Sequence, residues 1–223
     1  MKIDILTLFP NLFSGFLSES IIKRAIASGK VEINLIDFRE YSPLHNKQVD
    51  DTPYGGGAGM LLRCEPIFLC LDAIKTPDSY VILLTPDGQT FQQKTAVDLS
   101  KKKHLIFICG RYEGFDERIK TLVDVELSLG DFVLTGGEVP AMAMVDAITR
   151  LLPGVINSDS LVDESFTNNL LDYPNYTKPS EYRGLKVPDV LISGDHAKIK
   201  AYREEEQKKK TKERRPDLFE GEK

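Results

Sequence analysis

Arg150 and the two carboxylates Asp163 and Glu164 are the residues of this 223-residue chain whose chemistry is easiest to name. A carboxylate can remove a proton as a general base, and an arginine can stabilise the negative charge that remains. Arg150 ends an apolar, helix-like run, whereas both carboxylates lie in a polar, turn-rich stretch. Exposed carboxylates in such stretches are usually only solvated, and spacing alone favours that interpretation over a catalytic role.

Glycine follows an apolar run at two other places, and each place is a candidate ligand-binding turn. "LIFIC" (105–109) leads into "GRYEGFDER" (110–118), and "FVLT" (132–135), which is typical of a strand, leads into Gly136 and Gly137. Open α/β sheets bind ligands at the carboxyl ends of their strands, and glycine lets backbone approach closely. If the two strands are neighbours, their loops form one crevice. The alternatives are solvated ion pairs for the first loop and a plain tight turn for the second.

The stretch "VDDTPYGGGAGM" (49–60) interrupts the pattern with four glycines in five positions. A long aperiodic loop inside a compact domain is usually functional or disordered. Its glycines would let the backbone approach a large substrate. The residues predicted to contact that substrate are Asp50, Tyr54, Gly55, Gly56 and Gly59.

The end of the chain is locally basic, although the formal net charge of the whole chain is -5. Residues 198–223 carry ten Lys or Arg and seven Asp or Glu. The run "KKKTKERR" (208–215) is suited to phosphate contact through Lys208, Arg214 and Arg215, but a solvated helix face is the more common interpretation of such charge.

The elements that position these residues alternate between strands and helices. Short apolar runs rich in β-branched residues favour a parallel sheet covered on both faces, and helical patterns between them complete βαβ units. The sequence therefore predicts an α/β fold. Strands are expected at 3–9, 31–37, 80–85 and 105–109, and helices at 12–28 and 65–74.

The composition changes after residue 155. A polar stretch is followed by closely spaced prolines and then by a charged, helix-favouring segment at 196–215. We expect a large domain over 1–157, a linker over 158–169 and a small domain over 170–223.

Cysteine usage and the start of the chain bear on the compartment. Cys64, Cys70 and Cys109 are scattered in apolar contexts, which predicts buried free thiols in a reducing cytoplasm. The three histidines are equally dispersed, so we predict no metal site. The opening "MKIDILTLFP" does not resemble a signal peptide, and no apolar run is long enough to span a membrane.

Six motifs, in a fixed order along the chain, carry a resemblance to a known family. They are "PYGGGAGM", "GRYEGFDER", "LGDFVLTGGEVPAM", "ITRLLPGV", "ESFTNNLLDYPNYTKP" and "RRPDLFEG". Together they resemble the bacterial tRNA (guanine-N1)-methyltransferases of the SPOUT superfamily. The resemblance implies a deep trefoil knot in the α/β domain, a mostly helical C-terminal domain, and a homodimer with active sites at its interface. Without it we would expect no knot, because folds are almost never knotted.

The resemblance also implies a cofactor and a substrate. Members of the family transfer a methyl group from S-adenosylmethionine to N1 of the guanosine at position 37 of tRNA, and the family suggests that Mg²⁺ assists. The loops of the knot hold the cofactor largely through backbone groups. By resemblance, the cofactor contacts are Leu84, Thr85, Pro86, Gly110, Tyr112, Glu113, Leu129, Gly130, Leu134, Gly136 and Gly137.

The catalytic groups follow from the same resemblance, with one departure. Arg150 corresponds to the arginine that stabilises charge on the guanine. The family typically has aspartate directly before Ser-Phe, where this chain has Glu164 before Ser165. We favour Glu164 as the base that removes the N1 proton, and Asp163 is the alternative. The departure keeps a non-catalytic RNA-binding homologue open as a second hypothesis. A nucleotide-dependent oxidoreductase is disfavoured, because no predicted strand is followed by G-x-G-x-x-G.

Overall fold

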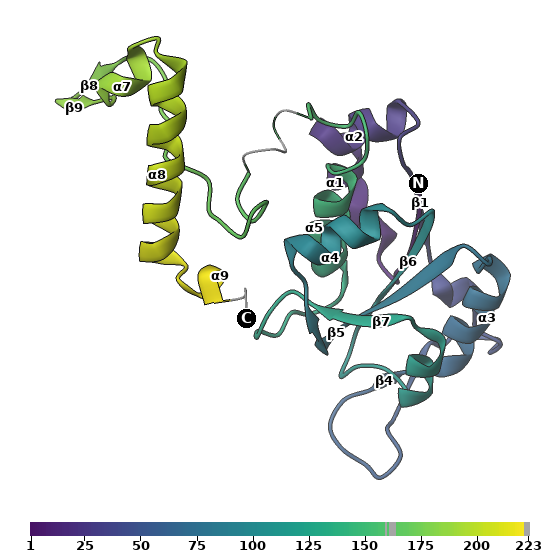
Figure 1. Cartoon of the computed structure of the whole chain (residues 1–223). Helices are drawn as coiled ribbons and strands as arrows, with labels where there is room; N and C mark the ends of the chain where they lie inside the picture. The colour runs from purple at the N-terminus through teal and green to yellow at the C-terminus, as the bar shows by residue number, and fades with distance from the viewer. Residues whose placement is uncertain (159, 161–163, 221–223) are drawn as a thin grey trace. The chain divides into compact units, whose positions relative to one another are not determined.

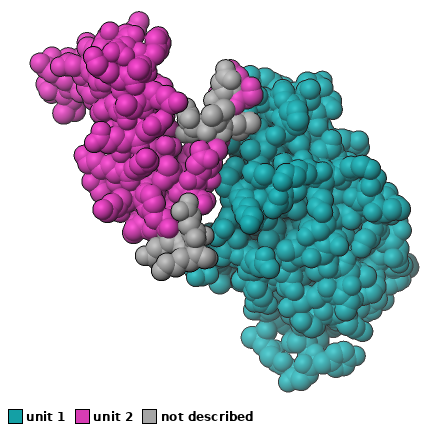
Figure 2. Space-filling model, viewed as in Figure 1, with its two compact units in different colours: residues 1–156 teal, residues 157–223 magenta. Residues whose placement is uncertain are grey.

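Figure 1 shows the computed structural model, which describes residues 1–158, 160 and 164–220. The chain divides into two compact units, Met1–Ile156 and Asn157–Lys223, which Figure 2 colours separately. The roles expected for the two parts of the chain, and for a linker between them, stay predictions.

The first unit is built on a five-stranded sheet in the order β2-β1-β6-β5-β7, in which every neighbouring pair of strands is parallel. The expected α/β fold with a parallel central sheet is therefore confirmed. The four predicted strands are present, with ends that shift by up to five residues. The strands of the sheet are β1 (Lys2–Leu6), β2 (Glu32–Ile36), β5 (Ser79–Thr90), β6 (His104–Cys109) and β7 (Val125–Ser128).

Helices connect these strands. The helix predicted at 65–74 is confirmed, but the single helix predicted at 12–28 is wrong. Glu19 has extended backbone (φ -126, ψ 159) and Ser20 has a φ of 52, so the chain breaks there into two short helices. The helices of the first unit are η1 (Pro10–Phe13), α1 (Ser14–Ser18), α2 (Ser20–Ala27), η2 (Phe38–Tyr41), α3 (Cys64–Ile74), α4 (Gln93–Ser100), η3 (Glu117–Leu122) and α5 (Glu138–Thr149).

β6 is buried along its whole length and separates two apolar cores. Phe107 packs in the core that contains Met144 of α5, whereas its neighbour Ile106 packs in the core that contains Ile67 of α3. Successive side chains of a strand point to opposite faces. The continuous apolar run of β6 therefore reflects burial on both faces, as the sequence predicts.

The strand predicted at 132–135 is wrong. These residues form a loop, in which Phe132 is 56% and Val133 is 86% exposed. The strand of this region is β7, which ends at Ser128, and the sequence analysis missed it. Gly130, with a φ of 153, lies between the end of β7 and this apolar run. The apolar composition of 132–135 is typical of a strand, but these residues lie at the surface.

The second unit contains a two-stranded hairpin and the longest described helix. The prediction of a helix at 196–215 is confirmed by α8, which begins after Asp195, whose side chain accepts a 3.1 Å hydrogen bond from the Lys198 amide. In the described parts of both units, no helix combines the length and apolar character that a membrane crossing requires. The elements of the second unit are β8 (Glu181–Tyr182), β9 (Leu185–Lys186), α7 (Asp189–Ile192), α8 (His196–Arg214) and α9 (Asp217–Glu220).

The three cysteines are free and buried, as predicted. Burial raises the pKa of the Cys70 thiol to about 12 and raises the pKa of Cys109 well above its ordinary value. Both thiols therefore stay protonated at neutral pH, which excludes them as ready nucleophiles.

A buried polar network joins the central strands near their amino ends. His104 Nε2 lies 2.8 Å from Asp4 Oδ2, and His104 Nδ1 lies 2.7 Å from Ser79 Oγ. Lys2 and Asn34 also donate to the Asp4 carboxylate. Burial alone would raise the pKa of Asp4, but the hydrogen bonds from Lys2, Asn34 and His104 outweigh it and lower that pKa.

We expect Asp4→Asn to reduce the free energy of unfolding by about 1–3 kcal/mol at neutral pH, because the amide cannot accept every hydrogen bond that the carboxylate accepts. Since folding lowers the pKa of Asp4, the wild-type advantage is present above a pH of about 4 and is lost as the pH falls through the folded-state pKa. Urea unfolding of both proteins from pH 7 down to about pH 2 measures this difference. A difference that does not change with pH would contradict the role of the charged carboxylate.

Candidate functional site

A cavity of about 360 Å³ lies beside the irregularity in β5 and at the carboxyl ends of β6 and β7. All eleven residues that resemblance assigns to the cofactor line it, although they come from three separate stretches of the chain. Their roles as contacts stay predictions. The sequence analysis did not assign the other lining residues to a cofactor, and these are Asp87, Arg111, Gly114, Phe115, Glu117, Lys120, Leu127, Ser128, Phe132, Val133, Thr135 and Pro140.

The first wall of the cavity comes from an irregularity in β5. Leu84 and Gln89 both pair with Leu127 of β7, so the residues between them leave the ladder. Thr85 and Pro86 of this excursion line the cavity. Gly88 returns the chain to the ladder where a Cβ would lie 2.5 Å from the Glu126 carbonyl carbon, so a side chain does not fit.

The other two walls are the loops that follow β6 and β7, and they touch through backbone. The Gly137 amide donates a 2.9 Å hydrogen bond to the Gly110 carbonyl. A Cβ on Gly137 would lie 2.6 Å from Cys109 Cα, and a Cβ on Gly110 would lie 2.8 Å from the Phe115 ring. These glycines are required by close approach, so the two loops do form one crevice. The strands before them are not neighbours, as the prediction had required, because β5 lies between β6 and β7.

An ion pair lies beneath the crevice. Arg111 Nη2 lies 2.8 Å from Glu138 Oε2, and the Glu138 side chain is 2% exposed. Thr7 Oγ1 donates a 2.8 Å hydrogen bond to Glu138 Oε1. The Arg111 guanidinium also stacks on the Phe9 ring, 4.3 Å from its centroid. Glu138 is the first residue of α5, and no sequence pattern predicts that Arg111 is its partner.

Asp116 and Arg118 of "GRYEGFDER" form a local ion pair, as the simpler interpretation expects. Asp116 caps η3 by accepting from the Arg118 amide, and its carboxylate forms an ion pair of 2.6 Å with the Arg118 guanidinium. This part of the motif is therefore structural.

The glycine-rich loop is attached to the cavity wall through its second stem. The amide of Glu113 donates to the Met60 carbonyl, and the amide of Leu62 donates to the Gly114 carbonyl. Asp50 and Leu62 face each other across the short ladder of β3 (Asp50–Asp51) and β4 (Leu61–Leu62). Tyr54 is fully exposed. Gly55, Gly56 and Gly59 all have positive φ.

The predicted catalytic residues are not among the described residues that line the cavity. Arg150 is the C-cap residue of α5, and its amide donates to the Asp146 carbonyl. Glu164 belongs to the second unit. Asp163 lies outside the described residues.

The basic residues predicted for phosphate contact lie at the end of α8. Lys208 and Arg214 are exposed. Arg215 forms an ion pair of 2.6 Å with Asp217, and its hydrogen bonds with that carboxylate raise its pKa. Lys208 and Arg214 are therefore the better candidates for phosphate contact, which stays a prediction.

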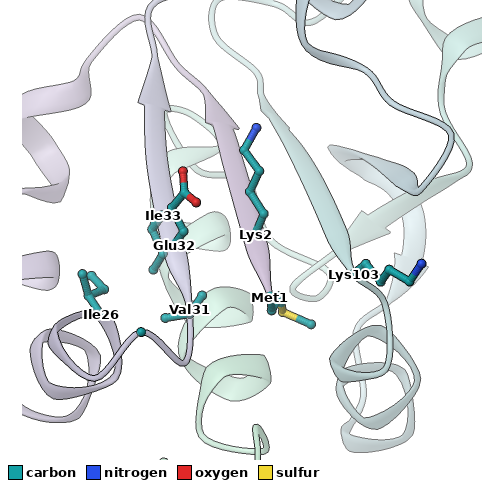
Figure 3. A pocket seen from close by; sticks show the side chains of 8 residues that line it. Met1, Lys2, Ile26, Val31, Glu32, Ile33 and Lys103 are labelled. Carbon is teal, nitrogen blue, oxygen red and sulfur yellow. The ribbon is translucent and has the colours of Figure 1, made fainter.

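A second hollow, of about 510 Å³, lies at the amino ends of β1 and β2 (Figure 3). The ammonium groups of Lys2 and Lys103 at its edge form ion pairs with Asp4 and Asp78. Ligands of α/β sheets bind at the carboxyl ends of strands. The glycine-lined cavity is therefore the better candidate site.

A parallel α/β sheet with a crevice of glycine loops at the carboxyl ends of its strands defines a ligand-binding α/β protein. The family model described as tRNA (Guanine-1)-methyltransferase TrmD matches residues 1–221. The chain belongs to this family, so the resemblance drawn from the six motifs and the expectation of a methyltransferase are confirmed.

Three relatives, each described as tRNA (guanine-N(1)-)-methyltransferase, are 54% identical to the chain. The alignment with the protein from Pediococcus pentosaceus covers 99% of this chain and 92% of that protein. For the protein from Malacoplasma penetrans these shares are 98% and 97%, and for the protein from Staphylococcus aureus they are 99% and 91%. The similarity therefore extends over nearly the whole length of these proteins.

We expect Gly137→Ala to reduce the free energy of unfolding by about 1–3 kcal/mol, because the added methyl group would meet the backbone of Cys109. Gly15→Ala is the matched control, since nothing lies within 4 Å of a Cβ there and Gly15 is inside α1. The control should be neutral or stabilising by up to about 1 kcal/mol. Thermal and urea unfolding measure both changes, and equal stability of the two variants would contradict the close approach.

Proposed function

We propose that this protein transfers a methyl group from S-adenosylmethionine to N1 of the guanosine at position 37 of tRNA, in the cytoplasm. The observation that carries the proposal is the gathering of eleven residues from three stretches around one cavity. Membership of the tRNA (Guanine-1)-methyltransferase family supports the same reaction.

The cavity fits S-adenosylmethionine in size, shape and charge. Its volume of about 360 Å³ lies within the range of about 300–1,000 Å³ for small-molecule sites. A Cβ on Gly110 or Gly137 would collide with neighbouring atoms, so the walls there are bare backbone that can approach a ligand. The lining cations Arg111 and Lys120 are both paired with carboxylates, which suits a ligand that carries a positive sulfonium. When bound, S-adenosylmethionine supplies an electrophilic methyl group.

The remaining chemistry belongs to side chains. The N1 nitrogen of guanine carries a proton, so its attack requires a base, and we assign that role to Glu164, with Asp163 as the alternative. Negative charge then develops on the neighbouring carbonyl oxygen, where Arg150 would stabilise it. Glutamate is longer than aspartate by one methylene and equally able to accept a proton.

We further propose that the protein is a homodimer whose partner subunit completes the site. Several large apolar residues near the cavity are exposed, and contiguous exposed apolar surface favours an interface. Phe132, Val133 and Leu134 line the cavity and are 56%, 86% and 40% exposed. Phe9 and Val139, which neighbour the ion pair and its helix, are 45% and 56% exposed.

We also propose that the chain of the first unit forms a trefoil knot. β5 lies between β6 and β7 in the sheet, yet the loop after β7 reaches back to form a hydrogen bond with Gly110, the residue that follows β6. A chain that returns across its neighbour in this way is what a knotted crossing requires. Assistance by Mg²⁺ rests on the family resemblance.

Glu164→Gln tests the base. Since glutamine cannot accept the N1 proton, we expect turnover on tRNA with guanosine at position 37 to fall by about 100-fold or more. Calorimetry should give an unchanged affinity for S-adenosylmethionine, because Glu164 is not among the residues that line the cavity.

The matched control is Asp163→Asn, which should retain turnover. An active Glu164→Gln protein with an inactive Asp163→Asn protein would move the base to Asp163. A wild-type protein that labels neither guanosine-37 tRNA nor its adenosine-37 variant would instead favour a non-catalytic RNA-binding homologue.

Lys208→Ala and Arg214→Ala should weaken tRNA binding and reduce its salt dependence. Each phosphate contact that is lost lowers the slope of log affinity against log salt by about 0.7–0.9. Binding titrations at several salt concentrations measure this slope. Lys103→Ala is the matched control. It also removes one positive charge, but Lys103 lies just before β6, at the end of that strand opposite the cavity. An equal loss of slope in Lys103→Ala would show a general charge effect and contradict a contact by α8.

A further inference from the structure

Three side chains from distant parts of the chain meet beneath the glycine crevice. Thr7 follows β1, Arg111 follows β6, and Glu138 begins α5. Thr7 and Arg111 each contact one carboxylate oxygen of Glu138 at 2.8 Å. The exposure of the Arg111 side chain is 18% and that of Glu138 is 2%, so both charges are largely removed from water. Each charge therefore depends on the other, because a single buried charge without its partner is strongly unfavourable.

Arg111 also fixes the loop that follows β7. Its Nη1 donates a 3.2 Å hydrogen bond to the Thr135 carbonyl. A Cβ on Gly136, the next residue, would lie 2.6 Å from Arg111 Cζ and 2.7 Å from Glu138 Oε2, so a side chain there would displace the ion pair. The guanidinium thus lies directly against the backbone that lines the cavity.

The backbone on the other side of the crevice is fixed by the same group of residues. Arg111 directly follows Gly110, and Glu138 directly follows Gly137. The hydrogen bond between Gly137 and Gly110 therefore lies one residue away from the ion pair at both ends. The side-chain pair and the backbone hydrogen bond together set the spacing of the two loops.

We infer that Arg111 and Glu138 are a positioning pair that holds the two cavity loops at the spacing that S-adenosylmethionine requires, with Thr7 orienting the carboxylate. This inference rests on the proposed function, because it concerns the cofactor of that reaction. Glu138 acts through Arg111 and the loop backbone and does not itself contact the ligand. Loss of the pair should therefore weaken cofactor binding and leave tRNA binding intact.

The experiment compares Glu138→Gln, Arg111→Gln and the double variant with wild type. Calorimetry with S-adenosylmethionine should give a dissociation constant raised by about tenfold or more in each single variant, which leaves one buried charge unpaired. The double variant should bind more tightly than either single variant, since it leaves no unpaired charge. In methyl-transfer assays, KM for the cofactor should rise while KM for tRNA changes by less than about twofold.

Asp4→Asn is the matched control for a merely structural effect. Asp4 is as buried as Glu138, with 1% exposure, but its network lies at the opposite ends of the strands. It should lose stability and keep the wild-type affinity for S-adenosylmethionine. If Glu138→Gln does not fold, Thr7→Val removes the hydroxyl that donates to Glu138 Oε1 and accepts from the Phe9 amide, and it should raise the dissociation constant by about two- to fivefold.

The outcomes separate the inference from the proposed function. If wild type binds the cofactor and Glu138→Gln, or Thr7→Val in its place, binds it equally well, the positioning role is overturned and the proposed function stands. If Asp4→Asn weakens cofactor binding as much as Glu138→Gln does, the effect is one of stability, and the positioning role is again overturned. A wild-type protein that binds no S-adenosylmethionine overturns both.

Discussion

The backbone contact between Gly110 and Gly137 is the constraint on which the rest of the site depends. No side chain can occupy this crossing, because a Cβ on Gly137 would meet the backbone of Cys109. The hydrogen bond across it brings the end of β6 against the start of α5, although β5 lies between β6 and β7 in the sheet. The cavity exists because these two loops are held together while the excursion in β5 stands apart from them.

Burial explains which parts of the fold were predictable from the sequence. The strand at 105–109 was predicted because both faces of β6 are covered, which makes its apolar run continuous. β7 was missed although its residues alternate between apolar and polar, because four residues are too few for this alternation to stand out. The exposed run at 132–135 was mistaken for a strand because composition alone cannot distinguish a buried apolar segment from one left at the surface.

The site was only partly predictable from the sequence. The glycines and the paired loops followed from spacing, and the individual cofactor contacts came from the family resemblance. The partnership of Arg111 with Glu138 spans 27 residues and is set by the tertiary arrangement of three loops, so no local pattern could indicate it. The separation of the cavity from the favoured base is in line with the sequence analysis: every residue that lines the cavity belongs to the first unit, whereas Glu164 belongs to the second.

The excursion in β5 has a consequence for how this architecture can change. Leu84 and Gln89, on its two sides, pair with the same residue of β7. The sheet is therefore closed on both sides of the four intervening residues, whatever path they follow. An insertion or deletion within Thr85–Asp87 would reshape one wall of the cavity without shifting the register of the sheet. The length of this wall can thus change while the pairing of the strands is kept. Ligand selectivity can therefore change in this fold without a change in the sheet.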